Sequence, residues 1–350
     1  MNGLAICLAS RSGVSAAAAA DVACCAEAAG FKAMFIAERC ADSLALAHSA
    51  LLGTERITVG TAIANAAVRH PAITALTAAT LAEESGGRFL LGLGVANAAL
   101  NETVLGLPAT RPVGYMREYL GVLKAVLAGG GDPRSGEYFS ISGFLPDRSP
   151  KPVPLYIAAL LPRMLALAGE LADGVFLNLM TTAQLPSVLG HIESGLAISG
   201  RAREEFVVAC LMPCCISADA DAATRAARQV VAGYAMHPAA GKLFSDSGFA
   251  PELGAVRERM LSGQAEAAAA SVSQEMIDAL VVHGDAEVLA GRISAYREAG
   301  VDLPVLFPMP IEDGWAAAMD RVIRAAAPHT ASPACPPERD RPQRKDAPHV

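Results

Sequence analysis

The stretch from residue 154 to residue 177 places an arginine and backbone amides at the start of a predicted helix. It reads PLYIAALLPRMLALAGELADGVFL, and residues 155–158 form a short apolar run typical of a buried parallel strand. Pro162 follows, and proline is favoured in the first turn of a helix. A helix that begins directly after a strand directs free N–H groups at the connecting loop, where its dipole favours an anion. Arg163 lies in the first turn, where a positive charge is unfavourable for the helix dipole, so its role could be to bind an anion. We therefore interpret this loop as a phosphate-binding loop; the alternative is an ordinary strand–helix connection.

Composition limits the classes of protein to which the chain can belong. It has 350 residues, 53% of them hydrophobic, and a formal net charge of -7. No run of about twenty apolar residues is free of charges or helix breakers, so we predict no membrane span. The first residues lack the basic segment of a secretory signal, and the acidic balance does not favour nucleic-acid binding. We therefore expect a protein that neither spans a membrane nor binds nucleic acid.

The cysteines do not form a metal-binding or disulfide pattern. There are eight, and none lies in a CxxC motif. Reduced, buried thiols in a cytoplasmic protein are the better interpretation, and we predict no metal site.

Eight apolar segments of strand length alternate with helical segments. They are Leu4–Leu8, Ala33–Ala37, Ile57–Ala62, Phe89–Leu93, Leu155–Ala158, Val175–Leu177, Phe206–Ile216 and Leu303–Phe307. Parallel strands joined by helices form a closed barrel or a doubly wound sheet. Eight such units suit a (β/α)8 TIM barrel, and no GxGxxG follows the first strand to support the doubly wound alternative.

Two segments fall outside this alternation. Residues 219–270 are alanine-rich and predict a helical insertion after the seventh strand, placed where it could cover a substrate pocket. Residues 328–350 are charged and proline-rich, which predicts a disordered tail. We therefore expect one barrel domain over residues 1–327.

Five short motifs occur in a specific order along the chain. They are ITVGTA with RHP within 57–71, SGGRFLLGLG at 85–94, GLP with RP and REY within 106–119, AGELADGV at 168–175, and VHGD with YREAGVD within 282–302. By these motifs the chain resembles the bacterial-luciferase-like flavin oxidoreductases, and within them the branch that uses the deazaflavin coenzyme F420. The resemblance implies a barrel with the coenzyme lying across the carboxyl ends of the strands.

The resemblance also implies positions for coenzyme binding. The loop after strand five, which holds the coenzyme phosphate by backbone N–H groups in this branch, corresponds to Ala158, Ala159, Leu160, Leu161 and Pro162. Leu160 and Leu161 stand where the branch often has Ser and Gly, so the backbone donors remain while a hydroxyl and a permissive φ are lost.

A second implied feature is a cis peptide bond at the end of strand three, under the coenzyme ring. The corresponding bond is Ala62–Ile63, next to Thr61. The amides of Asn65 and Asn101 follow strands three and four, and we assign them to the ring and the ribityl chain; turn formation is the alternative.

Glu38 and Asn97 occupy the positions that we assign to catalysis. In the sugar-phosphate dehydrogenases of the family an Asp-His pair stands near residues 38–39, and a glutamate acid stands near Asn97. Arg39 cannot act as a base and an amide has no proton to give, so that dehydrogenase chemistry is not expected. Glu38 could donate a proton or bind the pyrimidine edge of the ring; the alternative is a salt bridge with Arg39 or Arg11.

A basic rim is also expected, since coenzyme F420 ends in an oligoglutamate tail. Arg111, Arg117 and Arg163 are the candidates, each of which could equally be a solvated helix charge. Arg69 and His70 either lie near the coenzyme or begin the following helix.

The expected function is hydride transfer from reduced F420 to a C=C or C=N bond of a small organic substrate. The first alternative is an FMN-dependent monooxygenase on the same barrel, and the second is a flavin- or deazaflavin-binding paralogue without catalysis. The resemblance further implies a homodimer.

Overall fold

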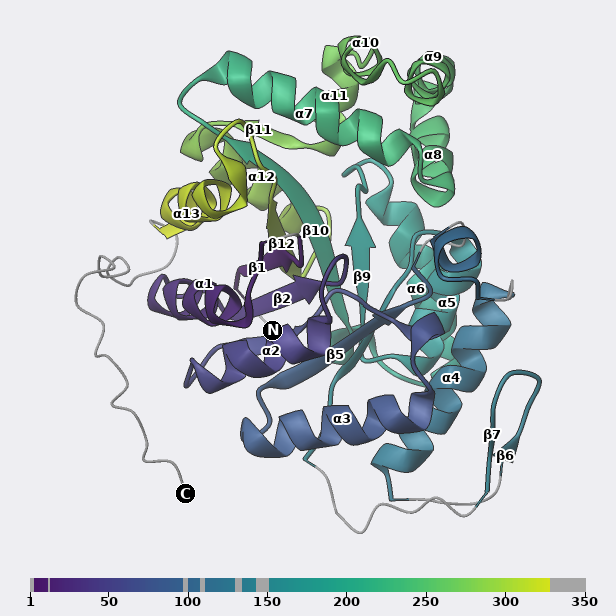
Figure 1. Ribbon diagram of the computed structural model, residues 1–350. Coiled ribbons are helices and arrows are strands. Elements are labelled where there is room, and N and C mark those ends of the chain that lie inside the picture. The colour runs from purple at the N-terminus through teal and green to yellow at the C-terminus, as the bar shows by residue number, and fades with distance from the viewer. Residues whose placement is uncertain are drawn as a thin grey trace.

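Eight parallel strands close into a barrel in a computed structural model of the chain, which describes residues 3–11, 13–96, 100–107, 111–129, 134–142 and 151–327 (Figure 1). Around the barrel the order is β1, β2, β3, β5, β8, β9, β10, β12, and β12 pairs with β1. The predicted (β/α)8 barrel is confirmed. The bounds of these strands are Ala5–Ala9, Ala33–Ala37, Thr58–Thr61, Phe89–Gly94, Leu155–Ala158, Gly174–Asn178, Val207–Ile216 and Leu303–Pro308.

Four shorter strands were not expected from the sequence. Two are parallel additions to the barrel, β4 (Ala64–Asn65) beside β5 and β11 (Val282–Gly284) beside β10. The other two, β6 (Arg134–Ser135) and β7 (Ser140–Ile141), form an antiparallel hairpin. Strands of two or three residues are too short to show a hydrophobic period, which explains why the sequence did not reveal them.

Helices surround the barrel and cover its outer face (Figure 1). In chain order α1 to α13 are Ala16–Ala28, Ser43–Leu52, Pro71–Glu84, Pro112–Leu127, Pro162–Leu171, Leu185–Ser199, Ala220–Ala235, Pro238–Phe244, Ala250–Leu261, Ala265–Ala270, Gln274–Leu280, Ala286–Glu298 and Gly314–Ala326. Ser15 and Asp285 cap α1 and α12 by accepting backbone N–H groups, as helix-start residues of these types do. Within the described part of the chain, no helix combines the length and the apolar character needed to cross a membrane.

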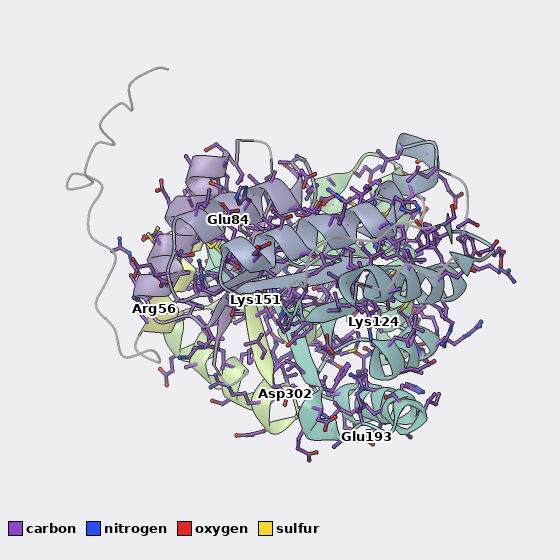
Figure 2. The ribbon with its side chains drawn as sticks, turned by 90° about the horizontal axis from the view of Figure 1, so that it is seen from below. Arg56, Glu84, Lys124, Lys151, Glu193 and Asp302 are labelled. Carbon is purple, nitrogen blue, oxygen red and sulfur yellow. The ribbon has the colours of Figure 1, made fainter. Side chains whose placement is uncertain are left out.

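Residues 219–270 are helical and follow β10, as predicted, and α7 to α11 group together on one side of the barrel (Figure 1). The predicted tail, 328–350, lies outside the described residues. Charged side chains such as Arg56, Glu84 and Glu193 are exposed, and Arg56 and Glu193 lie at the edge of the view in Figure 2.

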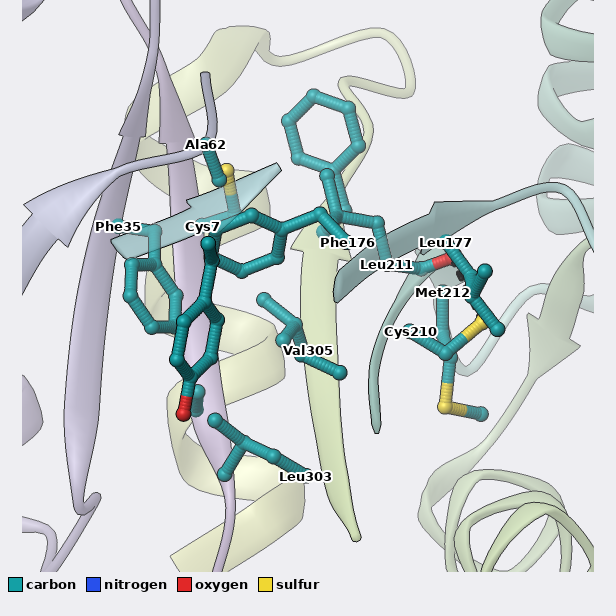
Figure 3. Packing of buried hydrophobic residues seen from close by; sticks show 14 of the residues in the cluster. Cys7, Phe35, Ala62, Phe176, Leu177, Cys210, Leu211, Met212, Leu303 and Val305 are labelled. Carbon is teal, nitrogen blue, oxygen red and sulfur yellow. Dashed lines mark hydrogen bonds between the residues drawn. The ribbon is translucent and has the colours of Figure 1, made fainter. Parts of the chain in front are cut away.

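The barrel interior is filled by apolar side chains, as Figure 3 shows for Phe35, Phe176 and Val305. The rings of Phe35 and Phe176 meet edge to face with centroids 4.9 Å apart. Cys210, Cys214 and Cys215 on β10 are buried, and burial raises the pKa of Cys215 to about 12. These thiols are therefore unreactive core residues, as the sequence indicated.

Candidate active site at the barrel mouth

The end of β3 carries a backbone bulge at the barrel mouth, by which we mean the carboxyl ends of the eight strands. The Ala62–Ile63 peptide bond is cis, as the resemblance implied. Two bonds from β2 and the loop after it hold this bulge: Ala62 N–H donates to Ile36 O at 2.9 Å, and Glu38 N–H donates to Ile63 O at 3.3 Å. The chain then resumes pairing as β4, so the bulge is fixed on both sides.

Ile63 on this bulge packs against the ends of the next two strands. A Cβ placed on Gly94 of β5 would lie 3.0 Å from Ile63 Cγ1 and 3.3 Å from the Ala158 Cβ of β8. The absence of a side chain at Gly94 therefore lets Ile63 and Ala158 approach each other. Residues predicted for coenzyme binding from two separate parts of the sequence are thus neighbours in the fold.

The loop from β8 to α5 leaves backbone donors free. Met164 N–H and Leu165 N–H both donate to Leu161 O, whereas the N–H groups of Leu160, Leu161 and Arg163 have no acceptor among the described residues. Leu161, the residue before the helix, is extended with φ -116° and ψ 152°. Neither leucine has a positive φ, so leucine in place of glycine causes no backbone strain here.

Glu38 is engaged on both of its carboxylate oxygens. Its Oε1 lies 2.8 Å from Arg69 Nη1, and its Oε2 accepts from Ser43 Oγ at 2.6 Å. Arg69 Nη2 also bonds Asp42 Oδ2 at 2.9 Å. The alternative partners considered from the sequence, Arg39 and Arg11, were wrong, because Arg69 reaches Glu38 from the segment that follows the β3 bulge. Although burial opposes it, the hydrogen bond from Arg69 lowers the pKa of Asp42.

Asn65 and Asn101 lie together at the mouth and are both buried. Asn65 Nδ2 donates to Asn101 Oδ1 at 2.9 Å, and Asn101 Nδ2 donates to Val95 O at 2.8 Å. Asn65 Oδ1 in addition accepts from Ala67 N–H at 3.0 Å. The pair ties the loop after β5 to the bulge, so turn formation, the alternative for these residues, is part of their role.

Of the other predicted residues, Thr61 and His70 make structural contacts. Thr61 Oγ1 donates to Gly92 O at 2.7 Å and accepts Gly92 N–H at 3.0 Å, so its hydroxyl is used within the sheet. His70 caps α3 by accepting Ala72 N–H at 3.3 Å, the helix-start alternative. Asn97 lies outside the described residues.

The expected basic rim is reduced to one arginine. Arg111 pairs with Glu137, and Arg117 Nη2 donates to Glu170 Oε2 at 2.6 Å. Arg163 is exposed and pairs with no carboxylate in the part of the chain that the structure describes. Of these three arginines, only Arg163 therefore has a charge available for an anion beside the free N–H groups of Leu160, Leu161 and Arg163, which we call the α5 amides.

Sequence reasoning missed a polar group on the other side of the mouth. Asn178, at the end of β9, donates through Nδ2 to Tyr234 Oη of α7 at 3.4 Å. Asn178 Oδ1 is buried and has no hydrogen-bond partner among the described residues. The position of Asn178 as the last residue of a barrel strand was the available signal.

The fold is a (β/α)8 barrel, and similarity to reductases that share it defines the class: the protein is an oxidoreductase. More particularly, the chain belongs to the luciferase-like monooxygenase family, whose sequence pattern matches residues 5–303.

Three relatives illustrate the similarity. A 5,10-methylenetetrahydromethanopterin reductase of Archaeoglobus fulgidus is 31% identical over 255 residues, 71% of this chain and 76% of that protein. The structure of the coenzyme F420 dependent tetrahydromethanopterin reductase of Methanopyrus kandleri superposes with a TM-score of 0.81 at 26% identity, covering 94% of this chain and 99% of that one. An F420-dependent secondary alcohol dehydrogenase shares the fold, with a TM-score of 0.75 at 19% identity over 93% of this chain and 98% of that chain.

Proposed function

We propose that the protein transfers a hydride from reduced coenzyme F420 to a C=C or C=N bond of a small organic substrate. The observation that carries this proposal is the packing of Ile63, on the bulge after β3, against Gly94 and Ala158 at the barrel mouth. The names of the Archaeoglobus and Methanopyrus relatives, both reductases, support it.

The residues present fit the coenzyme at two places. Ile63 and Ala158 offer an apolar platform for a flat ring, and the N–H groups of Leu160, Leu161 and Arg163 offer donors to its phosphate. When bound, the reduced deazaflavin supplies the hydride from one ring carbon. The chain's own part is to hold the ring at the bulge and to exclude water from it.

Glu38 is our candidate for the proton donor. Its N–H binds the bulge, so its side chain starts beside the ring platform. Both oxygens accept hydrogen bonds here, so the carboxyl group can hold a proton at Oε1 only when the bond to Arg69 Nη1 opens. We propose that substrate binding opens it. Asn97, which as an amide would hydrogen-bond the coenzyme and donate no proton to the substrate, and a cytoplasmic homodimer remain part of the proposal.

The description of the family as luciferase-like monooxygenases favours a second candidate, an FMN-dependent monooxygenase. A parallel fluorescence titration of the purified protein with F420 and with FMN separates the two. Tight F420 binding followed by oxidation of the reduced coenzyme with an organic acceptor supports the first. Tight FMN binding with oxygen consumption and no F420 binding supports the second. Binding of F420 without turnover by any acceptor tested would point to a paralogue without catalysis.

A further inference from the structure

Two arginines follow the first two strands side by side. β1 and β2 pair with Ala9 opposite Ala37, and Arg11 and Arg39 each lie two residues further on. The buried Ser10 joins the two loops: its Oγ accepts Arg39 N–H at 2.7 Å, and its carbonyl accepts Cys40 N–H at 2.7 Å. The two arginines, which we call the Arg11–Arg39 pair, are therefore held next to each other at the mouth.

This pair has no neutralising carboxylate. Neither guanidinium forms an ion pair within the described ranges, and the two nearby carboxylates, Glu38 and Asp42, are both bonded to Arg69. Burial and the neighbouring Arg39 lower the pKa of Arg11, as expected when a cation loses water and faces another cation. Two adjacent cations without an acid do not stabilise a fold, so their placement indicates a ligand from outside.

The groups that face the pair are polar and come from distant segments. Burial raises the pKa of Tyr234, whereas Asn178, Arg11 and Arg39 lower it, so this hydroxyl lies within the field of both guanidinium groups. The unpartnered Asn178 Oδ1 accompanies it at the end of β9, whose arrow points toward α7 in Figure 1. The ends of β1, β2 and β9 and the helix α7 thus contribute to one polar corner.

Within this corner, the Arg11–Arg39 pair is separate from the free N–H groups of the β8–α5 loop, although Asn178 lies on β9, the neighbour of β8. In the closed barrel β1 and β8 are four strands apart in either direction, so the Arg11–Arg39 pair and the β8–α5 loop lie on opposite sides of the mouth. An anion held by the pair is for that reason a second anion, distinct from a phosphate at α5.

We propose that Arg11 and Arg39 bind an anionic group of the substrate, a carboxylate or a phosphate. This proposal rests on the proposed function and adds the substrate class: an acidic organic molecule that reaches from the ring platform to the β1–β2 side. Guanidinium groups suit both anions because their N–H groups match two oxygens at once. Asn178 Oδ1 would accept an N–H or O–H of the same substrate.

Calorimetric titration with inorganic phosphate and with succinate tests the proposal, on the protein alone and on the protein saturated with F420. We expect the coenzyme-saturated protein to bind at least one of these anions. Arg11→Met combined with Arg39→Met should weaken that binding by about ten- to a hundredfold, as expected for lost charge-assisted hydrogen bonds. The coenzyme affinity should not change. Comparing the affinities for phosphate and for succinate shows which anion the Arg11–Arg39 pair prefers.

Arg56→Met is the matched control, since Arg56 is an exposed arginine near the start of β3, at the other end of the barrel. It should leave anion binding unchanged. The melting temperature of the Arg11/Arg39 variant should equal or exceed that of the wild type, because like charges are removed.

Three results would overturn the proposal: no anion binding by the wild type, anion binding unaffected by the double variant, or a loss of coenzyme affinity in that variant. Failure of the proposed function is detected by a different measurement, the binding of F420. If F420 does not bind, the titration of the protein alone still measures the pair, and Arg163→Ala identifies any phosphate bound at α5 instead.

Discussion

Glu38 combines a fixed backbone with a side chain engaged by two donors. Its N–H holds the bulge, while Arg69 and Ser43 bond its carboxylate. Because the backbone contact does not depend on the side chain, Glu38→Gln should leave F420 affinity unchanged. It should lower turnover about 10²- to 10⁴-fold, the usual contribution of a positioned proton donor. Single-turnover oxidation of the reduced coenzyme measures this. Turnover equal to that of the wild type would remove Glu38 from the chemistry.

Arg163 is the arginine whose charge is available beside the α5 amides. We expect Arg163→Ala to weaken F420 binding by about tenfold, the loss of one charge-assisted contact. A deazaflavin riboside without the phosphate should bind both proteins equally. Arg117→Ala is the control: its charge is already paired with Glu170, so its effect should stay below about twofold. Equal losses with and without the phosphate would show that Arg163 acts elsewhere.

At the scale of elements, the contact between the β3 bulge and β5 depends on Gly94. A methyl group there would lie 3.0 Å from Ile63 Cγ1, closer than ordinary contact, so Ile63 must move. We predict that Gly94→Ala weakens F420 and phosphate-free deazaflavin alike, by about tenfold, because the ring platform is displaced.

Gly121→Ala in α4 is the control for that substitution, since a Cβ there meets nothing within 4 Å. It should leave binding unchanged and stabilise the helix by about 0.5–1 kcal/mol. If Gly94→Ala binds the ring as well as the wild type, the bulge is not the platform.

The junction of α1 and β3 is held by one carboxylate. Glu27 accepts Glu55 N–H at 3.2 Å and Ile57 N–H at 2.7 Å, and its side chain is 13% exposed. Burial opposes it, but these backbone donors lower the pKa of Glu27 below its usual 4.5. Because this pKa is lower in the folded state, ionised Glu27 contributes its full stabilisation to the fold when the pH is above the pKa of the unfolded chain. That contribution is lost as the pH falls through the pKa of the folded protein.

Glu27→Gln should therefore lower the free energy of unfolding by about 1–3 kcal/mol at neutral pH. The difference from the wild type should narrow as the pH falls below the usual carboxyl pKa of 4.5 and through the lowered pKa of the folded wild type. Urea unfolding at several pH values measures both effects, with the exposed Glu193→Gln as control. A difference that stays constant across pH would mean that the charge of Glu27 does not matter.

The barrel as a whole was predictable because its eight strands are buried on both faces and read as continuous apolar runs. The β8–α5 loop was found by its local pattern of an apolar strand followed by Pro162 and a helix, whereas the bulge at Ala62–Ile63 was found only by resemblance, since it has no local signature. The expected partners of Glu38 were wrong because Arg69 lies 31 positions away and meets Glu38 only because β2 and β3 are neighbours in the sheet. Asn178, Tyr234 and the Arg11–Arg39 pair were missed for the same reason, because their meeting depends on the order of strands around the ring.

The central claim for the whole molecule is that the barrel mouth holds a deazaflavin ring on the Ile63 bulge and its phosphate on the α5 amides. A fluorescence titration of the purified protein with F420, with the phosphate-free riboside and with FMN tests it most directly. We predict that F420 binds tightest, that the riboside binds more weakly because it lacks the phosphate contacts, and that FMN binds weakest. Tight FMN binding with no response to F420 or the riboside would contradict it.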